Sequence, residues 1–228
     1  MSLAVLSPHL DDAVLSLGAM LAASDEPVRV ITVLAGDPSA GRPAGAWDAE
    51  SGAITAGQAA ARRREEDRRA CDSLGVEPVW FPYGDEQYGR GAEDDEIWAV
   101  LHPAIGEATT VLAPGFPLRH ADHKWLHDLV RRSRDRAWKL GLYVEQPYAL
   151  GRGDATLALD ASGVSVPFVP VPAPWSARRA KRRACLDYSS QLGLLAARHD
   201  TDARGLVRRI QRHELRWGGE RVAWLEDA

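Results

Sequence analysis

The chain has 228 residues, of which 45% are hydrophobic and 26% charged, so it can bury a sizeable core and is not globally disordered. Its formal net charge is −4, whereas nucleic-acid binders carry a strongly basic surface, so we expect no nucleic-acid partner. No apolar run reaches the ~18 residues of a membrane span, and the first residues lack the basic and apolar regions of a signal peptide. We therefore expect a cytoplasmic protein with no membrane partner. Its two cysteines are too few for a disulfide framework and are expected to be free thiols.

Apolar runs alternate with helical periodicity over the first two thirds of the chain. The runs and the periodic stretches predict strands at residues 3–7, 28–34, 79–81, 110–113 and 142–144, and helices at 12–23, 57–75, 93–105 and 122–140. Strands that alternate with helices are typical of an α/β fold with a mainly parallel sheet and helices on both faces.

The pattern changes after Gly151. It predicts a pair of strands at 155–160 and 164–171, helices at 176–195 and 202–213, and a last strand on the edge of the sheet at 222–225. We interpret residues 151–228 as an extension of a core at about 3–150, so that 1–228 forms a single domain. The basic run at 178–183 predicts a solvated helix face, with contact to an anionic substrate group or a partner as the alternative.

Two long connections, 36–56 and 82–93, each follow a predicted strand. They therefore belong to the carboxyl edge of the sheet, and loops of this length in a compact domain are usually functional or disordered. Both contain aromatic residues that either stack on a sugar ring or pack against the body of the protein, namely Trp47, Tyr83 and Tyr88.

A histidine and two acids lie within four residues directly after the first strand. His9 and Asp12 are three positions apart across the turn from strand to helix, so both can face one point above the sheet edge, with Asp11 between them. One Asp at this position is explained by capping of the helix. Capping does not explain the His and the second acid.

A second cluster, His120 to His123, follows the fourth strand and begins the next helix. His123 and His127 have the i, i+4 spacing of helical zinc sites, so His127 is an alternative ligand. In the common doubly wound order the first and fourth strands are neighbours, and ligands bind in the crevice between them. Two His and one carboxylate with an open position form a catalytic zinc site, and the remaining acids and His can act as general base and electrophile.

In these two motifs the chain resembles the PIG-L/LmbE-type N-acetylglucosaminyl deacetylases, which are zinc amidases with a Rossmann-like fold. Their P-H-P-D-D motif corresponds to Pro8–Asp12, with Leu10 in place of the second Pro, and their H-x-D-H motif is matched fully at His120–His123. Weaker matches, which extend the resemblance over roughly residues 3–192, are Arg63, Glu66, Leu74, Gly75, Asp85, Glu145 to Tyr148 and Tyr188 to Gln191.

The resemblance implies a role for each motif position. It implies that one zinc ion is held by His9, Asp12 and His123. Asp11 would be the general base, His120 would stabilise the oxyanion and protonate the leaving amine, and Asp122 would orient His120. Contacts to the substrate are implied for Arg63, Asp85 and Glu145. For Arg63 the alternative is an ion pair with Glu66 on the same helix.

The expected function is therefore that of a zinc-dependent hydrolase that removes an N-acetyl or other N-acyl group from an amino sugar or an aminoglycoside-like small molecule. Three alternatives remain open. They are a thiol-conjugate amidase of the same family, a non-catalytic sugar- or nucleotide-binding protein, and a phosphoesterase. No G-x-G-x-x-G or P-loop motif is present, so we expect no dinucleotide or ATP site.

Overall fold

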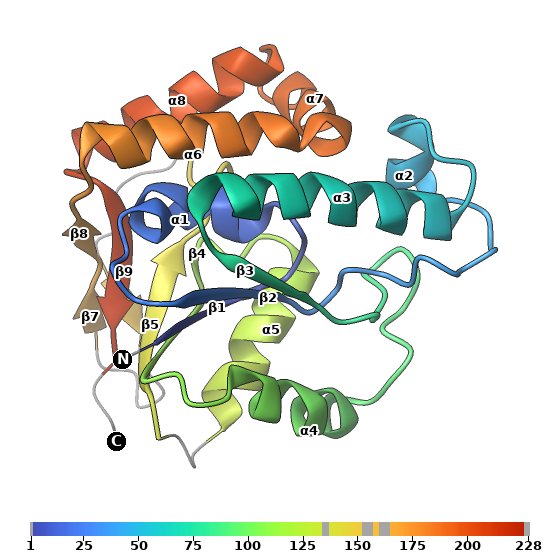
Figure 1. Ribbon diagram of the computed structural model, residues 1–228, viewed down its shortest axis with the longest axis horizontal. Coiled ribbons are helices and arrows are strands. Elements are labelled where there is room, and N and C mark those ends of the chain that lie inside the picture. The colour runs from blue at the N-terminus through green and yellow to red at the C-terminus, as the bar shows by residue number, and fades with distance from the viewer. Residues whose placement is uncertain (1, 134–136, 152–156, 160–164, 226–228) are drawn as a thin grey trace.

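A seven-stranded sheet in the order β3-β2-β1-β4-β5-β9-β8 runs through the centre of the protein (Figure 1). The computed structural model describes residues 2–133, 137–151, 157–159 and 165–225. The first five strands are mutually parallel, whereas β9 runs antiparallel to both of its neighbours. The strands are β1 (Leu3–Ser7), β2 (Val28–Thr32), β3 (Glu77–Trp80), β4 (Thr110–Phe116), β5 (Lys139–Val144), β8 (Val169–Val171) and β9 (Glu220–Trp224). The predicted mainly parallel α/β sheet is confirmed.

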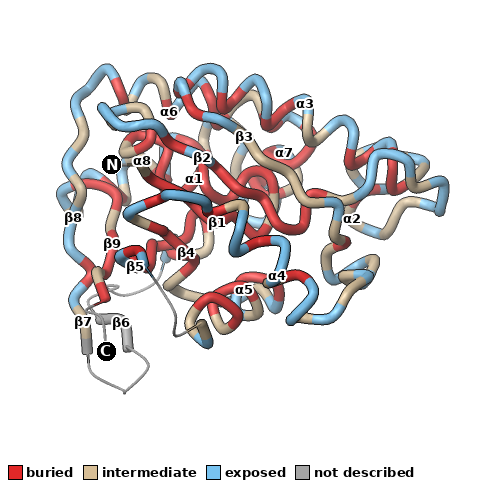
Figure 2. The backbone as a smooth tube through the Cα atoms, turned by 60° about the horizontal axis from the view of Figure 1, so that its bottom comes forward, coloured by how far each residue is buried: buried red, intermediate tan, exposed pale blue. Residues whose placement is uncertain are grey.

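Helices cover both faces of this sheet (Figure 1). One face carries α1 (Asp12–Ala22) and α3 (Ala56–Leu74), and the other carries α4 (Asp94–Ile105) and α5 (Ala121–Arg132). A further layer packs over α1 and α3 and consists of α6 (Trp175–Asp187), α7 (Ser189–Ala197) and α8 (Ala203–Arg216). As Figure 2 shows, the central strands β1, β4 and β5 are mostly buried between the two sets of helices, whereas β3 and β8 at the ends of the sheet are partly exposed. None of the described helices is long and apolar enough to cross a membrane.

Several predicted boundaries are wrong, because tertiary pairing outweighs local pattern. The last strand, β9, lies inside the sheet between β5 and β8 rather than at its edge. The helix predicted to reach residue 140 ends at Arg132, since Lys139–Val144 pairs with β4 and β9. The connection at 36–56 contains a short helix, α2 (Ala46–Glu50).

The predicted strand pair is present as β6 (Leu157–Leu159) and β7 (Ser165–Pro167), which pair antiparallel. Residues 155, 156, 160 and 164 of that prediction lie outside the described residues. The second predicted strand is divided, because Val169–Val171 leaves β7 and pairs with β9 instead.

The helix predicted at 176–195 is two helices, α6 and α7, that meet at Tyr188. The Tyr188 hydroxyl donates a hydrogen bond to the buried Asp67 of α3, which also accepts from the Trp80 indole. Beside it, both Glu66 oxygens accept hydrogen bonds from the first turn of α7, from the Ser189 and Ser190 side chains and the Ser190 backbone. Two adjacent acids of α3 therefore attach the outer helical layer to the sheet.

Asp67 makes the stability of this junction depend on pH. Burial raises the pKa of Asp67 to about 7, although the hydrogen bonds that its carboxyl accepts from Tyr188 and Trp80 lower this pKa. A carboxyl whose pKa is raised in the folded state stabilises the protein at low pH, and this contribution is lost as the pH rises through the folded-state pKa. The destabilisation caused by Asp67→Asn should therefore shrink between about pH 4 and pH 7 in urea unfolding, which is the window between the unfolded-state and folded-state pKa values. Asp72→Asn, at an exposed position of the same helix, makes the same chemical change away from the junction and is the matched control.

Lys181 contradicts the prediction of a fully solvated basic face on α6. Its side chain is fully buried, whereas Arg179, Arg182 and Arg183 are exposed as expected. The Lys181 ammonium group lies 2.5 Å from a Glu214 oxygen and 2.6 Å from a Glu220 oxygen. Because the Glu220 carboxylate also accepts hydrogen bonds from Ala19 and Met20 of α1, this charged cluster joins α1, α6, α8 and β9.

Candidate metal and catalytic site

The two histidine-containing motifs meet because β1 and β4 are neighbouring parallel strands. Leu3 pairs with Thr110, and Val5 pairs with Leu112. Parallel neighbours end at the same edge of a sheet, so the segments that follow β1 and β4 converge there. The predicted adjacency of the two strands is thus confirmed.

Ser7 performs the capping that could have explained Asp11. Its hydroxyl accepts a hydrogen bond from the Ala13 backbone in the first turn of α1 and donates one to the His9 carbonyl. Asp11 occupies the N-cap position of α1 without a side-chain hydrogen bond to the helix. The Asp11 carboxyl, 9% exposed, instead lines the cavity described below.

Three side-chain atoms from the two motifs converge on one point. His9 Nδ1 lies 3.0 Å from Asp12 Oδ2, His123 Nε2 lies 3.2 Å from the same oxygen, and the two ring nitrogens are 3.3 Å apart. A tetrahedral ion with bonds of about 2.0–2.1 Å separates its ligand atoms by roughly 3.3 Å. Two imidazoles and a carboxylate in this triangle fit a divalent metal such as zinc.

The electrostatics of the triangle favour a bound cation. Burial lowers the pKa of His9, but hydrogen bonds to Asp12 and Asp122 outweigh burial and raise this pKa to about 9. Burial likewise opposes protonation of His123, but Asp12 and Glu145 raise its pKa well above the usual value. Burial, and then the charge of Asp12, raise the pKa of Asp11 to about 6. Because a metal would replace protons on the imidazoles, its binding is expected to release protons.

Carboxylates behind the two imidazoles hold them in place. Asp122 Oδ2 lies 3.1 Å from His9 Nε2, and Asp122 also receives hydrogen bonds from Arg90 and from the Glu86 backbone. Such outer carboxylates fix the orientation and tautomer of a metal-binding imidazole. Asp122 Oδ2 also lies 3.7 Å from His120 Nδ1, so this carboxylate is close to both imidazoles, and its orienting role toward His120 stays a prediction.

Glu145 holds His123 in the same way. Its Oε1 is 2.5 Å from His123 Nδ1, and its Oε2 accepts a hydrogen bond from the Leu118 backbone. Glu145 is 1% exposed and does not line the cavity, so the predicted contact of Glu145 with a substrate is corrected. Its carboxylate lies behind the His123 imidazole instead.

His120 caps α5 and faces the cavity. Its Nδ1 accepts a hydrogen bond from the Asp122 backbone, so in the neutral ring the proton is on Nε2. Burial and the neighbouring imidazoles lower the pKa of His120. Ring nitrogens of His9, His120 and His123 all lie within 4.8 Å of one another, so His120 is near the triangle without being one of its corners.

His127, the alternative ligand, points elsewhere. Its Nδ1 donates to the Pro114 carbonyl oxygen at 2.7 Å, and its Nε2 lies 3.3 Å from Arg131. Both ring nitrogens are thereby engaged within α5 and β4. His127 is a structural residue of the described fold.

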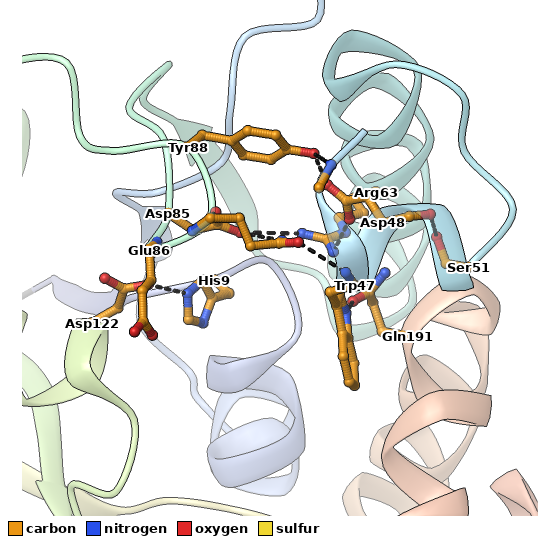
Figure 3. Close-up of polar contacts among 12 residues, drawn as sticks. His9, Trp47, Asp48, Ser51, Arg63, Asp85, Glu86, Tyr88, Asp122 and Gln191 are labelled. Atoms are coloured by element: carbon orange, nitrogen blue, oxygen red, sulfur yellow. Dashed lines mark hydrogen bonds and ion pairs between the residues drawn. The ribbon is translucent and has the colours of Figure 1, made fainter. Parts of the chain in front are cut away.

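A cavity of about 400 Å³ adjoins the triangle, a size typical of small-molecule sites. Arg63 and Asp85 both line it and lie 3.9 Å apart, and Arg63 also pairs with the buried Asp48 (Figure 3). Among the described residues Arg63 makes no ion pair with Glu66, which Arg62 approaches instead. The alternative interpretation of Arg63 as a partner of Glu66 is therefore wrong.

Comparison with known proteins identifies the family. The family model described as GlcNAc-PI de-N-acetylase (PIG-L) matches residues 4–133, which include both motifs of the triangle. The chain belongs to the PIG-L family.

Relatives of this PIG-L family member include deacetylases with glycoside substrates in their names. The chain is 33% identical over 170 residues to 2'-N-acetylparomamine deacetylase of Streptomyces fradiae; the match covers 66% of this chain and 58% of that protein. The solved structure of A40926 pseudoaglycone deacetylase Dbv21 is 29% identical, with a TM-score of 0.79 over 99% of this chain and 98% of that one. A triple mutant of a deacetylase of teicoplanin biosynthesis is 27% identical, with a TM-score of 0.79 over 98% and 97% of the two chains.

Sequence reasoning assigned no role to three residues of this PIG-L site. Asp48 is buried, pairs with Arg63 and accepts a hydrogen bond from the Tyr88 hydroxyl. Arg90 pairs with Asp122, and Gln191 accepts from the Trp47 indole. No local signal marks Asp48 or Arg90, since each partner is remote in sequence. Gln191 could have been found, because it closes the Tyr188 to Gln191 segment that matches the family pattern.

Proposed function

We propose that this chain is a metal-dependent N-deacetylase that hydrolyses the amide of an N-acyl amino sugar within a glycoside. The convergence of His9, Asp12 and His123 beside a cavity lined by Asp11 and His120 carries the proposal. Membership of the de-N-acetylase family and the deacetylases among its relatives support it.

The proposed metal is one zinc ion held by His9, Asp12 and His123, a donor set with an open position of the kind found in catalytic zinc sites. When bound, zinc supplies Lewis acidity that lowers the pKa of water and polarises the amide carbonyl. Asp122 and Glu145 keep the two imidazoles oriented toward the ion.

Asp11 accepts a proton from the attacking water as the general base, and His120 donates a hydrogen bond from Nε2 to the developing oxyanion. The Asp122 backbone N–H disfavours a second proton on His120 Nδ1, since that nitrogen would then face a donor. We therefore propose that the proton taken up by Asp11, rather than one from His120 as the resemblance implies, passes to the departing amine. The products are the carboxylate and the free amino sugar.

Arg63 and Asp85 are proposed to bind the sugar hydroxyls, because both line the cavity and offer one donor group and one acceptor group. The ion pair with Asp48 fixes the Arg63 side chain in its position. No described contact supports a role of Arg63 in zinc binding.

The test is mass-spectrometric screening of N-acetylated glycosides with the metal-loaded protein, with free acetate and the free amine measured together. Loss of an acetyl group from an amino sugar is the expected result. Turnover of p-nitrophenyl phosphate in the absence of any deacetylation would favour a phosphoesterase, and cleavage of thiol conjugates alone would favour the amidase. Stoichiometric sugar binding with no turnover of any substrate would favour a binding protein.

The ligand set has its own test, in which metal content is measured by mass spectrometry after purification without added metal. His123→Ala should abolish metal binding, because it removes one corner of the triangle. His127→Ala is the matched control and should retain the metal, since His127 bonds to Pro114. The opposite result would refute the assignment of His123.

A further inference from the structure

The cavity has a second wall, and the side chains of this wall differ in chemistry from the triangle of His9, Asp12 and His123. On the side of His9 and His120 it is lined by carboxylates, among them Asp11 and Asp85. On the other side it is lined by Trp47 from α2 and by Leu195 and Arg198 from α7 and its end. Figure 3 shows Trp47 and Gln191 on one side of the opening and His9 with Asp122 on the other.

The Trp47 indole is held in position before any ligand binds. Its ring N–H donates to Gln191 Oε1 at 2.6 Å, and its backbone N–H donates to Gln87 Oε1 at 2.9 Å. Gln191 in turn donates to the Ser190 hydroxyl, which donates to the buried Glu66. An aromatic surface fixed in this way loses little entropy when a ring stacks on it.

Arg198 adds a cation to this wall. Its guanidinium lies 4.3 Å from the centre of the Trp47 ring, in cation–π contact. The residue is exposed, and within the part of the chain that the structure describes no carboxylate lies within ion-pair distance of it. A guanidinium in cation–π contact with a ring still has N–H groups that can donate to a carboxylate or phosphate.

We propose that Trp47, Leu195 and Arg198 form a second subsite, which binds the aglycone of the amino sugar and selects one that carries an anionic group, a carboxylate or a phosphate. This inference rests on the proposed deacetylase function. The carboxylate-lined side receives the N-acyl sugar, while the ring or apolar part of the aglycone lies against Leu195 and the part of the Trp47 ring that Arg198 leaves uncovered. The anionic group of the aglycone pairs with Arg198.

The experiment compares aryl glycosides of N-acetylglucosamine that differ only in charge. The para-carboxyphenyl and para-carbamoylphenyl glycosides have nearly the same shape, and the para-phosphonophenyl glycoside tests phosphate-type anions. For the wild type, kcat/KM for the carboxylate should exceed that for the neutral amide by about fivefold, the upper range of a solvent-accessible ion pair. The preferred anion is the one, carboxylate or phosphonate, whose glycoside has the larger kcat/KM relative to that of the neutral amide.

Variants test whether Trp47 and Arg198 cause the preference for an anionic aglycone. Arg198→Gln should bring the ratio of carboxylate to amide to about one, whereas Arg198→Lys should retain part of the preference. Arg208→Gln, at an exposed position of α8 that does not line the cavity, makes the same charge change and should keep the full ratio. Trp47→Ala should raise KM for both aryl glycosides relative to the methyl glycoside.

A wild-type ratio of about one for both anions, or a preference that survives Arg198→Gln, would overturn the inference. If the wild type hydrolyses none of the glycosides, the proposed deacetylase function fails instead. In that case titration calorimetry of the same glycosides with the wild type and Arg198→Gln still decides whether the anion-selective subsite exists.

Discussion

Replacing Asp11 with asparagine is expected to lower kcat by about 10²-fold or more, the usual contribution of a general base. Asparagine has nearly the same volume as aspartate but cannot accept the proton of the attacking water. Because Asp11 neither caps α1 nor forms a corner of the metal triangle, the variant should fold and keep its metal. KM should change little, since the lost interaction belongs to the transition state.

The measurement combines kcat and KM, from acetate release, with metal content and the unfolding midpoint of the same preparation. Asp128→Asn, on the exposed side of α5, is the matched control and should behave like the wild type. Near wild-type turnover by Asp11→Asn would refute the role of this residue. Loss of metal in the variant would instead make Asp11 a ligand.

The second large effect concerns stability: Lys181→Met is expected to cost about 3–5 kcal/mol in the free energy of unfolding, as for other buried pairs that lose one partner. Methionine fills most of the lysine volume, so the change removes the charge and leaves little cavity. Glu214 and Glu220 would then face each other while buried and without the cation that lies 2.5 and 2.6 Å from them. Burial already raises the pKa of Glu214 to about 8 despite Lys181, so proton uptake by this carboxyl should make the loss smaller at low pH.

Urea unfolding at several pH values measures this loss. Arg182→Met, one position along α6 but exposed, should change stability by less than about 0.5 kcal/mol. The triple variant Lys181→Met, Glu214→Gln and Glu220→Gln removes all three charges and should recover part of the lost stability. A cost of less than about 1 kcal/mol for Lys181→Met would show that the cluster contributes little.

Local pattern was sufficient for much of the fold. The five parallel strands and the helices that follow them are short-range features, because apolar runs and helical periodicity depend on neighbouring residues. The two motifs were found for the same reason, since His9 to Asp12 and His120 to His123 are each contiguous. Their convergence followed from one general rule, that β1 and β4 are neighbours in a doubly wound sheet.

The contacts that shape the site were decided only by the tertiary structure. Asp122 contacts His9 across 113 positions, Glu145 contacts His123 across 22, and the Trp47 indole reaches Gln191 across 144. Lys181 has the same sequence context as the exposed arginines beside it, yet α6 turns it toward Glu214 and β9. Residue type and spacing determined which groups could do the chemistry. Which groups hold, orient or neutralise them depends on long-range packing, because a side chain meets its partner only where the folded layers bring the two together.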